Sequence, residues 1–582
     1  MSANTPACKR DTAADMGTSR SQVLGATTSP LLEYSIGTAL QLAVQRWPQR
    51  EALVSVHQGI RLSYAQLGAR IDEIAAALLA LGLSPGDRVG VWACNCVEWT
   101  LAQFATAKAG LIQVNINPAY RLSEVEYTLN KVGVKALIAA ESYRSSDYVG
   151  MIEALAPEIA GSAAGMLDAA RLPALKTVIK IGGAPRAGWL RFDDLPQLAR
   201  PVQIAKLLAL QPSLHASQAI NIQFTSGTTG LPKGATLSHR NILNNGYFVG
   251  ASMDLREGDR LCIPVPLYHC FGMVMGNLAC ITHGATMIYP APTFDPLATL
   301  KAIESERCTG LHGVPTMFIA QLEHPEFERF DLSSLRNGVM AGAPCPEEVM
   351  RKLIARMNLR DITIAYGMTE TSPVSFQSSP ASPLDRRVST VGLVQPHLEC
   401  KVIDSDGNVV AHGERGELCT RGYSVMLGYW NDTEKTAEAI DADGYMHTGD
   451  LATIDAEGYC TIVGRIKDMV IRGGENIYPR EIEEFLFKHP LIEDAQVVGV
   501  PDEKYGEEVC AWVKLRAGAT MSEAQLREFC RERIAHYKVP RYVRFVEEFP
   551  MTVTGKIQKF MIRDAMTREI ASTSQPMHRS QG

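Results

Sequence analysis

Apolar residues in the first part of the chain alternate between helical spacing and short β-branched runs. Ile36–Trp47 and Tyr64–Leu83 carry their apolar residues at the spacing of one helix face, which predicts two amphipathic helices. Arg88–Ala93 and Val134–Ala139 are short apolar runs, which predict buried strands. Because strands and helices follow one another in turn, we expect a layered α/β domain.

The pattern changes between residues 385 and 463, where short strand-like pieces are separated by turns. Turn dipeptides stand at Asp406-Gly407, Asp443-Gly444 and Glu457-Gly458. Such spacing predicts an antiparallel sheet or small β-barrel-like subdomain attached to the α/β body.

After Gly464 the alternation of helices and strands returns on a smaller scale. The predicted helices are Pro479–Lys488 and Ser522–His536, and the predicted strands are Ala495–Val500, Val509–Leu515 and Tyr542–Val546. We therefore expect a large N-terminal domain over residues 31–463 and a small α+β C-terminal domain over 469–565. Residues 1–30 and 566–582 are expected to be a disordered tail and a loose polar tail.

The composition is that of a soluble globular protein, with 46% hydrophobic and 21% charged residues among 582. A net charge of −6 argues against a general nucleic-acid partner. The 13 cysteines show neither a zinc pattern nor a disulfide framework, which favours a reducing compartment. The longest apolar run, Ile74–Leu83, is far shorter than the ~20 residues of a membrane span. A cytoplasmic protein without a transmembrane segment is the expectation.

The stretch TSGTTGLPKG at residues 225–234 is almost free of large side chains. Its Gly, Ser and Thr residues expose backbone N–H groups and hydroxyls, and Lys233 adds a positive charge. It is not a Walker A motif, because Pro232 precedes the lysine and Gly234 follows it. The predicted strand Ala219–Phe224 precedes the loop, and a helix is predicted to start near Ser238. The loop is therefore either another kind of phosphate clamp or a flexible turn.

Four further polar stretches follow this loop in order. They are YGMTE at 366–370, HTGD at 447–450, GRIKDMVIRGGENIYP at 464–479 and TVTGK at 552–556. Together with the loop they resemble the core motifs of the acyl-adenylate-forming superfamily, which includes acyl-CoA synthetases, adenylation domains of peptide synthetases and luciferases. The resemblance covers residues 31–565, and medium-chain fatty acyl-CoA synthetases are the most similar members.

The resemblance implies an ATP site with Mg²⁺. Thr369 would bond the α-phosphate and Glu370 would hold Mg²⁺. Asp450 would accept from the ribose hydroxyls, and Arg465 would contact the ribose or phosphate. Lys556 would bridge the carboxylate and the α-phosphate as the anhydride forms. The loop residues expected around the β- and γ-phosphates are Thr225, Ser226, Gly227, Thr228, Thr229, Gly230, Leu231, Pro232 and Lys233.

The same resemblance places the adenine and the mobile domain. Gly342, Ala343 and Pro344 would lie against one face of the adenine, with Tyr366 stacked on the other. The family swings its C-terminal domain about a hinge between two half-reactions, which would put residues 464–468 at the hinge and Lys467 at its pivot. Gly474 would then line the pantetheine tunnel.

The acid pocket is expected to be apolar and open. Gly367 stands where two-carbon-specific relatives carry Trp, and Phe271, Met273 and Met275 suggest an apolar lining. His269 is either an active-site residue or an ordinary half-buried histidine. The expected substrate is a medium- to long-chain fatty acid, and free CoA is the expected acceptor of its acyl group. A homodimer is a further expectation.

Two other functions stay open at this point. One is an adenylating enzyme that loads a separate carrier protein or activates an aryl acid. The other is a non-catalytic binding protein that has kept the fold.

Overall fold

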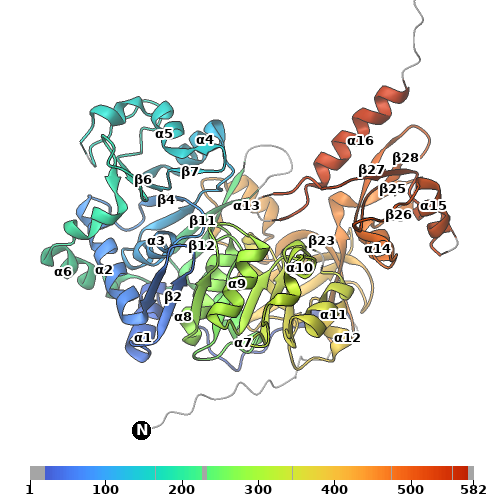
Figure 1. The fold of residues 1–582 in the computed structure, drawn as a ribbon, viewed down its shortest axis with the longest axis horizontal. Helices are drawn as coiled ribbons and strands as arrows, with labels where there is room; N and C mark the ends of the chain where they lie inside the picture. Colours follow the sequence, from blue (N-terminus) through green and yellow to red (C-terminus); the bar gives the residue numbers. More distant parts are fainter. Residues whose placement is uncertain are drawn as a thin grey trace, which may run out of the picture.

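The computed structural model describes residues 20–163, 165–225, 232–343, 345–473, 475–531, 533–552 and 555–574. Three sheets and their helices form the larger part of the chain, and the orange-to-red C-terminal part stands at one side of it (Figure 1). This arrangement confirms the predicted α/β N-terminal domain and the small α+β C-terminal domain.

The first large sheet is mostly parallel. Its strands from β10 to β11 run parallel, and β12 and β22 add antiparallel partners at one edge. In spatial order they are β10 (Leu190–Arg191), β9 (Thr177–Lys180), β6 (Val134–Ala139), β4 (Arg88–Trp92), β5 (Ile112–Asn115), β11 (Ala219–Thr225), β12 (Lys233–Ser238) and β22 (Gly428–Tyr429). The buried runs of β4 and β6 suit a sheet covered on both faces.

The second large sheet has a parallel centre with antiparallel strands at both ends. Its strands are, in order, β19 (Leu393–Val394), β18 (Val374–Gln377), β17 (Asp361–Gly367), β16 (Asn337–Ala341), β15 (Gly310–Gly313), β13 (Arg260–Cys262), β14 (Thr286–Tyr289), β2 (Glu51–Ser55) and β3 (Ile60–Ser63).

Helices separate and cover these sheets. They are α1 (Ile36–Arg46), α2 (Tyr64–Ala80), α3 (Val97–Lys108), α4 (Leu122–Val132), α5 (Tyr148–Leu155), α6 (Pro201–Leu210), α7 (His239–Ser252), α8 (Ala279–His283), α9 (Pro296–Glu306), α10 (Pro315–Leu322), α11 (Glu347–Arg356), α12 (Leu384–Ser389) and α13 (Thr433–Ala439). Capping boxes begin α2 at Ser63 and α7 at Ser238, so both starts follow from local sequence.

One buried core joins the two large sheets. It contains Val89 of β4, Ile71 of α2, Phe104 of α3 and Met287 of β14, together with Val274 of the π-helix η4 (Phe271–Leu278). Helices lie between the two large sheets and pack their buried faces against both, so the two sheets are held at a fixed separation.

The third sheet is the predicted antiparallel one. Its strands are, in order, β1 (Gln22–Leu24), β20 (Leu398–Ile403), β21 (Gly416–Gly422), β23 (Met446–Ile454) and β24 (Cys460–Arg465). The prediction of a disordered tail over 1–30 was wrong for its last part, because β1 pairs with β20 and Ser21 is fully buried. Residues 1–19 lie outside the described part.

The C-terminal domain has its own sheet and core. The sheet runs β26 (Glu475–Ile477), β25 (Val470–Arg472), β28 (Gly506–Leu515) and β27 (Ile492–Asp502), with β29 (Tyr542–Phe545) also paired to β28, and the helices are α14 (Pro479–Leu486), α15 (Glu523–Arg531) and α16 (Lys559–Ser574). The loose tail expected from residue 566 is instead helical as far as Ser574, and Met566 packs into the domain.

The strand–loop–helix expected around Thr225–Ser238 contains one element more. β11 and β12 pair as an antiparallel hairpin, with Thr225 opposite Lys233, before α7 begins. β12 has the sequence KGATLS, with Thr236 as its one β-branched residue, and it runs directly into the Ser238 cap of α7, so the sequence did not mark it as a strand.

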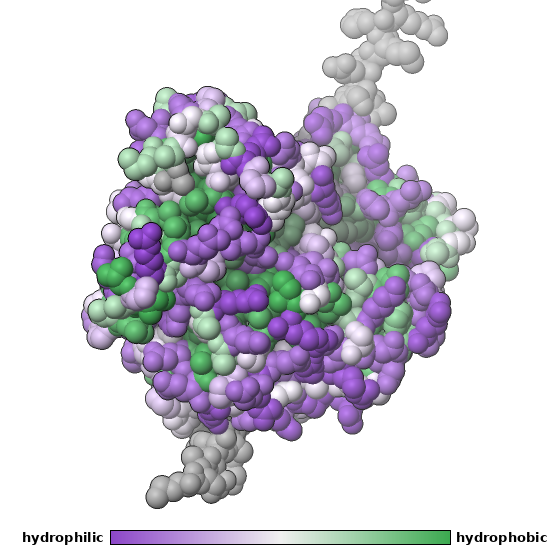
Figure 2. Space-filling view, turned by 60° about the vertical axis from the view of Figure 1, so that its left-hand side comes forward, coloured by the Kyte–Doolittle hydropathy of each residue, from purple (hydrophilic) through white to green (hydrophobic). Residues whose placement is uncertain are grey.

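The surface drawn in Figure 2 is largely hydrophilic, with smaller hydrophobic patches between the polar residues. Among the described helices, none has the length and apolar character needed to cross a membrane.

Candidate active site

A buried carboxylate lies beyond the end of β17. Glu370 belongs to the 3₁₀-helix η6 (Thr369–Thr371) and is only 5% exposed. Its Oε1 accepts hydrogen bonds from Thr225 Oγ1 at 3.0 Å and from the Tyr429 hydroxyl at 2.9 Å. Both donors contact the same oxygen, so Oε2 is the atom that suits a hard cation such as Mg²⁺.

A second carboxylate stands on the antiparallel sheet. Asp450 on β23 lies opposite Arg465 on β24, and Arg465 Nε donates to Asp450 Oδ1 at 3.0 Å. The Tyr366 hydroxyl donates to Asp450 Oδ2 at 2.7 Å. Burial, and then the Asp450 charge, raise the pKa of Tyr366 well above its usual value. Tyr366 is therefore a positioning residue for Asp450, a role that the sequence did not indicate.

Cationic side chains from separate segments converge near these two carboxylates. Lys233 Nζ lies 4.3 Å from the centre of the Tyr429 ring. Burial lowers the pKa of Lys467, and Arg465 and then Lys233 lower it further. A group of cationic side chains beside two carboxylates suits a site that holds a polyanion.

Lys556 reaches this group from the C-terminal domain. Burial lowers its pKa and the Arg465 charge lowers it further, while Glu370 and Asp450 act in the opposite direction. A Cβ built on Gly342 would lie 3.7 Å from Lys556 Cε. The Thr316 hydroxyl donates to the Gly555 carbonyl at 3.5 Å, which ties the lysine's turn to the N-terminal domain.

His269 lies close enough to Lys556 for the lysine charge to act on its imidazole. Burial lowers the pKa of its imidazole to about 3, and the nearby Lys556 charge contributes. Its Nδ1 accepts from the Phe271 N–H at 3.2 Å at the start of η4. His269 is thus a half-buried side chain that is neutral at neutral pH, and its role in the active site stays a prediction.

Some of the remaining predicted positions lie among the described residues, and the others lie outside them. Thr369 precedes Glu370 in η6, the Pro232 carbonyl accepts from Tyr127 at 3.2 Å, and Ala343 follows Gly342. Lys467 lies in the 3₁₀-helix η7 (Ile466–Asp468), and its role as a hinge stays a prediction. The positions outside the described residues are Ser226, Gly227, Thr228, Thr229, Gly230, Leu231, Pro344 and Gly474.

The interpretation of Gly367 as an opening in the acid pocket was wrong. A Cβ on its backbone would lie 1.7 Å from the Pro373 carbonyl oxygen and 2.9 Å from Val374 Cα. That carbonyl accepts from the Met368 N–H at 2.9 Å and closes the turn between β17 and β18. The glycine is therefore needed for a close approach of two backbone segments, and not for substrate space.

Sequence reasoning missed Tyr429. It stands at the end of β22, and its hydroxyl and ring contact Glu370 and Lys233. Its only sequence signal is an aromatic pair, Tyr429-Trp430, after a glycine, which is too common to mark a site.

Two family profiles match this chain. The profile described as AMP-binding enzyme matches residues 40–430. The chain belongs to the AMP-binding enzyme family. The profile of the C-terminal domain of these enzymes matches residues 481–556, so the match ends at Lys556.

Relatives match along nearly the whole chain. The Bacillus subtilis protein YngI is 49% identical over 92% of this chain and 97% of its own length. The mitochondrial medium-chain acyl-CoA ligase ACSF2 of Danio rerio is 48% identical over 94% of this chain and 91% of its own. The solved anthranilate CoA ligase AuaEII, in complex with anthranoyl-AMP, is 28% identical, covers 94% of this chain and 100% of its own, and superposes with a TM-score of 0.81.

Proposed function

We propose that the protein is an AMP-forming acid–thiol ligase. It joins a carboxylic acid to ATP as acyl-AMP with release of pyrophosphate, and then transfers the acyl group to CoA. The observation that carries this proposal is the convergence of Lys233, Arg465, Lys467 and Lys556 around Glu370 and Asp450. A triphosphate is the polyanion that such a group of cations suits.

In the first half-reaction, positive charge must face the phosphorus that the carboxylate attacks. Lys556 supplies it between the acid and the α-phosphate, and Thr369 holds an α-phosphate oxygen. The loop from Thr225 to Lys233 surrounds the β- and γ-phosphates. Bound Mg²⁺ neutralises charge on the phosphates, and Glu370 Oε2 is the oxygen that would hold it.

The nucleoside part binds beside the antiparallel sheet. Asp450 accepts from the ribose hydroxyls, with Arg465 and Tyr366 keeping its two oxygens in place. Gly342, Ala343 and Pro344 face the adenine. The acid enters past His269 and Phe271, where a neutral imidazole adds no charge to repel or trap the substrate.

The second half-reaction needs a different arrangement, because Lys556 stands where the thiol must approach. Rotation of the C-terminal domain about Lys467 withdraws the lysine and brings Gly474 to the pantetheine path. The half-buried position of Lys556 and its turn's contact with Thr316 fit the adenylating arrangement.

The acid is a medium-chain fatty acid in this proposal. Support comes from ACSF2, the relative named as a medium-chain acyl-CoA ligase, which is 48% identical. An aryl acid is the second candidate, because AuaEII is an anthranilate CoA ligase, but that protein is only 28% identical. A cytoplasmic location and a homodimer stay predictions.

Separate assays of the two half-reactions test the proposal. Lys556→Ala should lower pyrophosphate release by a few orders of magnitude over a panel of fatty and aryl acids, because it removes charge that stabilises the transition state. Thioester formation from supplied acyl-AMP and CoA should stay near the wild-type rate. Lys559→Ala is the matched control, because Lys559 pairs with Glu483 inside the C-terminal domain at 2.6 Å. Equal loss in both half-reactions would contradict the assigned role of Lys556.

A further inference from the structure

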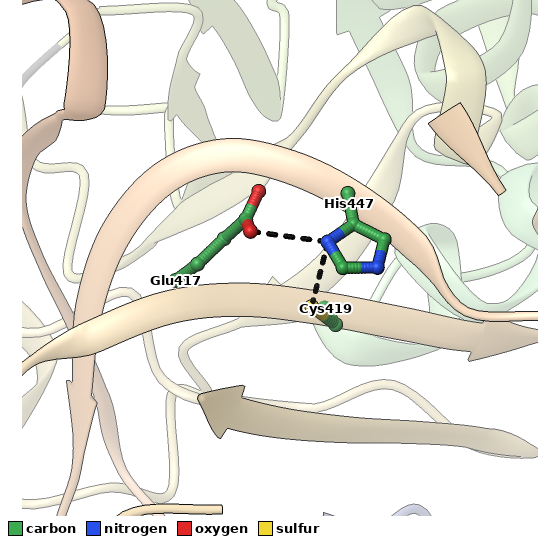
Figure 3. A group of neighbouring side chains, drawn as sticks. All are labelled: Glu417, Cys419 and His447. Carbon is green, nitrogen blue, oxygen red and sulfur yellow. Dashed lines mark hydrogen bonds and ion pairs between the residues drawn. The ribbon is translucent and has the colours of Figure 1, made fainter. Parts of the chain in front are cut away.

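Three potential metal ligands meet on the antiparallel sheet, apart from the nucleotide site. Glu417 and Cys419 lie on β21, and His447 lies on β23 directly opposite Cys419 (Figure 3). His447 Nδ1 is 3.0 Å from Glu417 Oε2 and 3.7 Å from Cys419 Sγ. We call these three residues the Glu417 cluster.

Their spacing matches that of ligands around one small cation. Ideal tetrahedral coordination, with Zn–N near 2.1 Å and Zn–S near 2.3 Å, places nitrogen and sulfur about 3.6 Å apart and nitrogen and oxygen about 3.4 Å apart. The observed separations are 3.7 Å and 3.0 Å, and the three ligand atoms lie within 4.8 Å of one another. Only small side-chain shifts are needed to admit the cation.

The surroundings of the cluster suit a bound cation as well. Asp441 Oδ2 lies 3.6 Å from Nε2, the other ring nitrogen of His447, which is the position from which a carboxylate orients a metal-bound imidazole. The His447 side chain is 31% exposed, which gives an ion a way in, whereas Cys419 is fully buried. One positively charged residue, Lys401, stands opposite Cys419 on β20, but its Nζ lies over the Tyr445 ring, 3.9 Å from the ring centre.

The cluster also closes the base of a bulge that carries Asp450. The pairing of β21 with β23 shifts between Cys419, opposite His447, and Glu417, opposite Leu451. The step of two residues from Glu417 to Cys419 on β21 is therefore matched by a step of four residues, from His447 to Leu451, on β23. The additional residues of β23 form a bulge, and this bulge contains Asp450. Glu417 Oε1 accepts from the Gly449 N–H at 3.0 Å within that bulge.

We propose that Glu417, Cys419 and His447 bind one thiophilic divalent cation, of the kind represented by Zn²⁺ and Cd²⁺, and that the cation clamps the bulge bearing Asp450. Binding forms bonds to Cys419 Sγ, His447 Nδ1 and Glu417 Oε2. The thiol proton leaves to solvent, and the imidazole proton that faces Glu417 moves from Nδ1 to Nε2, on the side of Asp441. Water takes the fourth position. Hard cations such as Mg²⁺ do not compete, because they prefer a full set of oxygen ligands.

The test is titration of the full-length protein with Cd²⁺ in the absence of nucleotide. The ultraviolet charge-transfer band of a cadmium thiolate should saturate with one tight equivalent, and Cys419→Ser should lose that equivalent. Asp441→Asn should keep the band but weaken binding about 10- to 100-fold, because only the orientation of the imidazole is lost. Cys94→Ser removes a half-buried thiol elsewhere and is the matched control.

Hydrogen exchange gives an independent measurement of the clamp. Zn²⁺ should slow amide exchange in the peptide over residues 446–451 of the wild type, and leave it unchanged in Cys419→Ser. A tight equivalent that survives Cys419→Ser, or the lack of any saturable binding, would overturn the proposal. None of these measurements depends on acyl-CoA formation, so their failure leaves the proposed function untouched.

Discussion

The hydroxyl of Tyr366 offers a sharp test of how the ribose carboxylate is held. Tyr366→Phe keeps the ring and removes the 2.7 Å hydrogen bond to Asp450 Oδ2. Hydrogen bonds to charged groups contribute about 1.5–3 kcal/mol. Arg465 still holds the other oxygen at 3.0 Å, so the lower end of that range applies. We expect kcat/KM for ATP to fall roughly tenfold, mostly through KM.

The assay is pyrophosphate release as a function of ATP concentration at saturating acid. Tyr459→Phe is the matched control, because it removes a hydroxyl that bonds Ser382 at 3.3 Å. With deoxy-ATP analogues that lack a ribose hydroxyl, the effect of Tyr366→Phe should shrink, since Asp450 has then lost its partner. An ATP KM within twofold of wild type, in a folded variant, would refute the positioning role.

Two further predictions concern stability. Gly367→Ala should destabilise the protein by about 2 kcal/mol or more in urea unfolding, because its Cβ meets the Pro373 carbonyl, whereas Gly161→Ala, with nothing within 4 Å of its Cβ, should change little. Burial lowers the pKa of His239 to about 3, so the unfolded chain binds its proton first, and this contribution to stability, complete above pH ~6.5, should decrease by about 2 kcal/mol by pH 5. His239→Asn, which can still accept the Ile36 N–H, should give a shallower pH dependence of the urea midpoint.

Equal stability of Gly367→Ala and wild type would restore the pocket interpretation of that glycine. A pH dependence unchanged by His239→Asn would show that the other buried imidazoles, His269, His283 and His312, dominate acid destabilisation.

Local sequence determined many of the helices and strands and the order of the motifs. The apolar run of Val134–Ala139 forms a strand with those bounds, and Ser238 caps α7 where the sequence predicted a helix to start. Such features depend on periodicity and on neighbours within four residues, which the sequence states directly. The five motifs that indicate nucleotide chemistry are likewise contiguous stretches.

Only the tertiary structure decided which side chains meet. Tyr366 and Asp450 are 84 residues apart, yet one bond joins them. The strand Gln22–Leu24 is too short to be recognised alone and exists because β20 offers it an edge. The sequence suggested that Gly367 opens the acid pocket, and the structure showed otherwise, because the atoms that a Cβ would meet belong to the backbone of Pro373, six residues away. Periodicity in the sequence specifies which face of a helix or strand is buried and how long that element is. Strand register, bulges and domain closure decide which charged side chains lie next to one another.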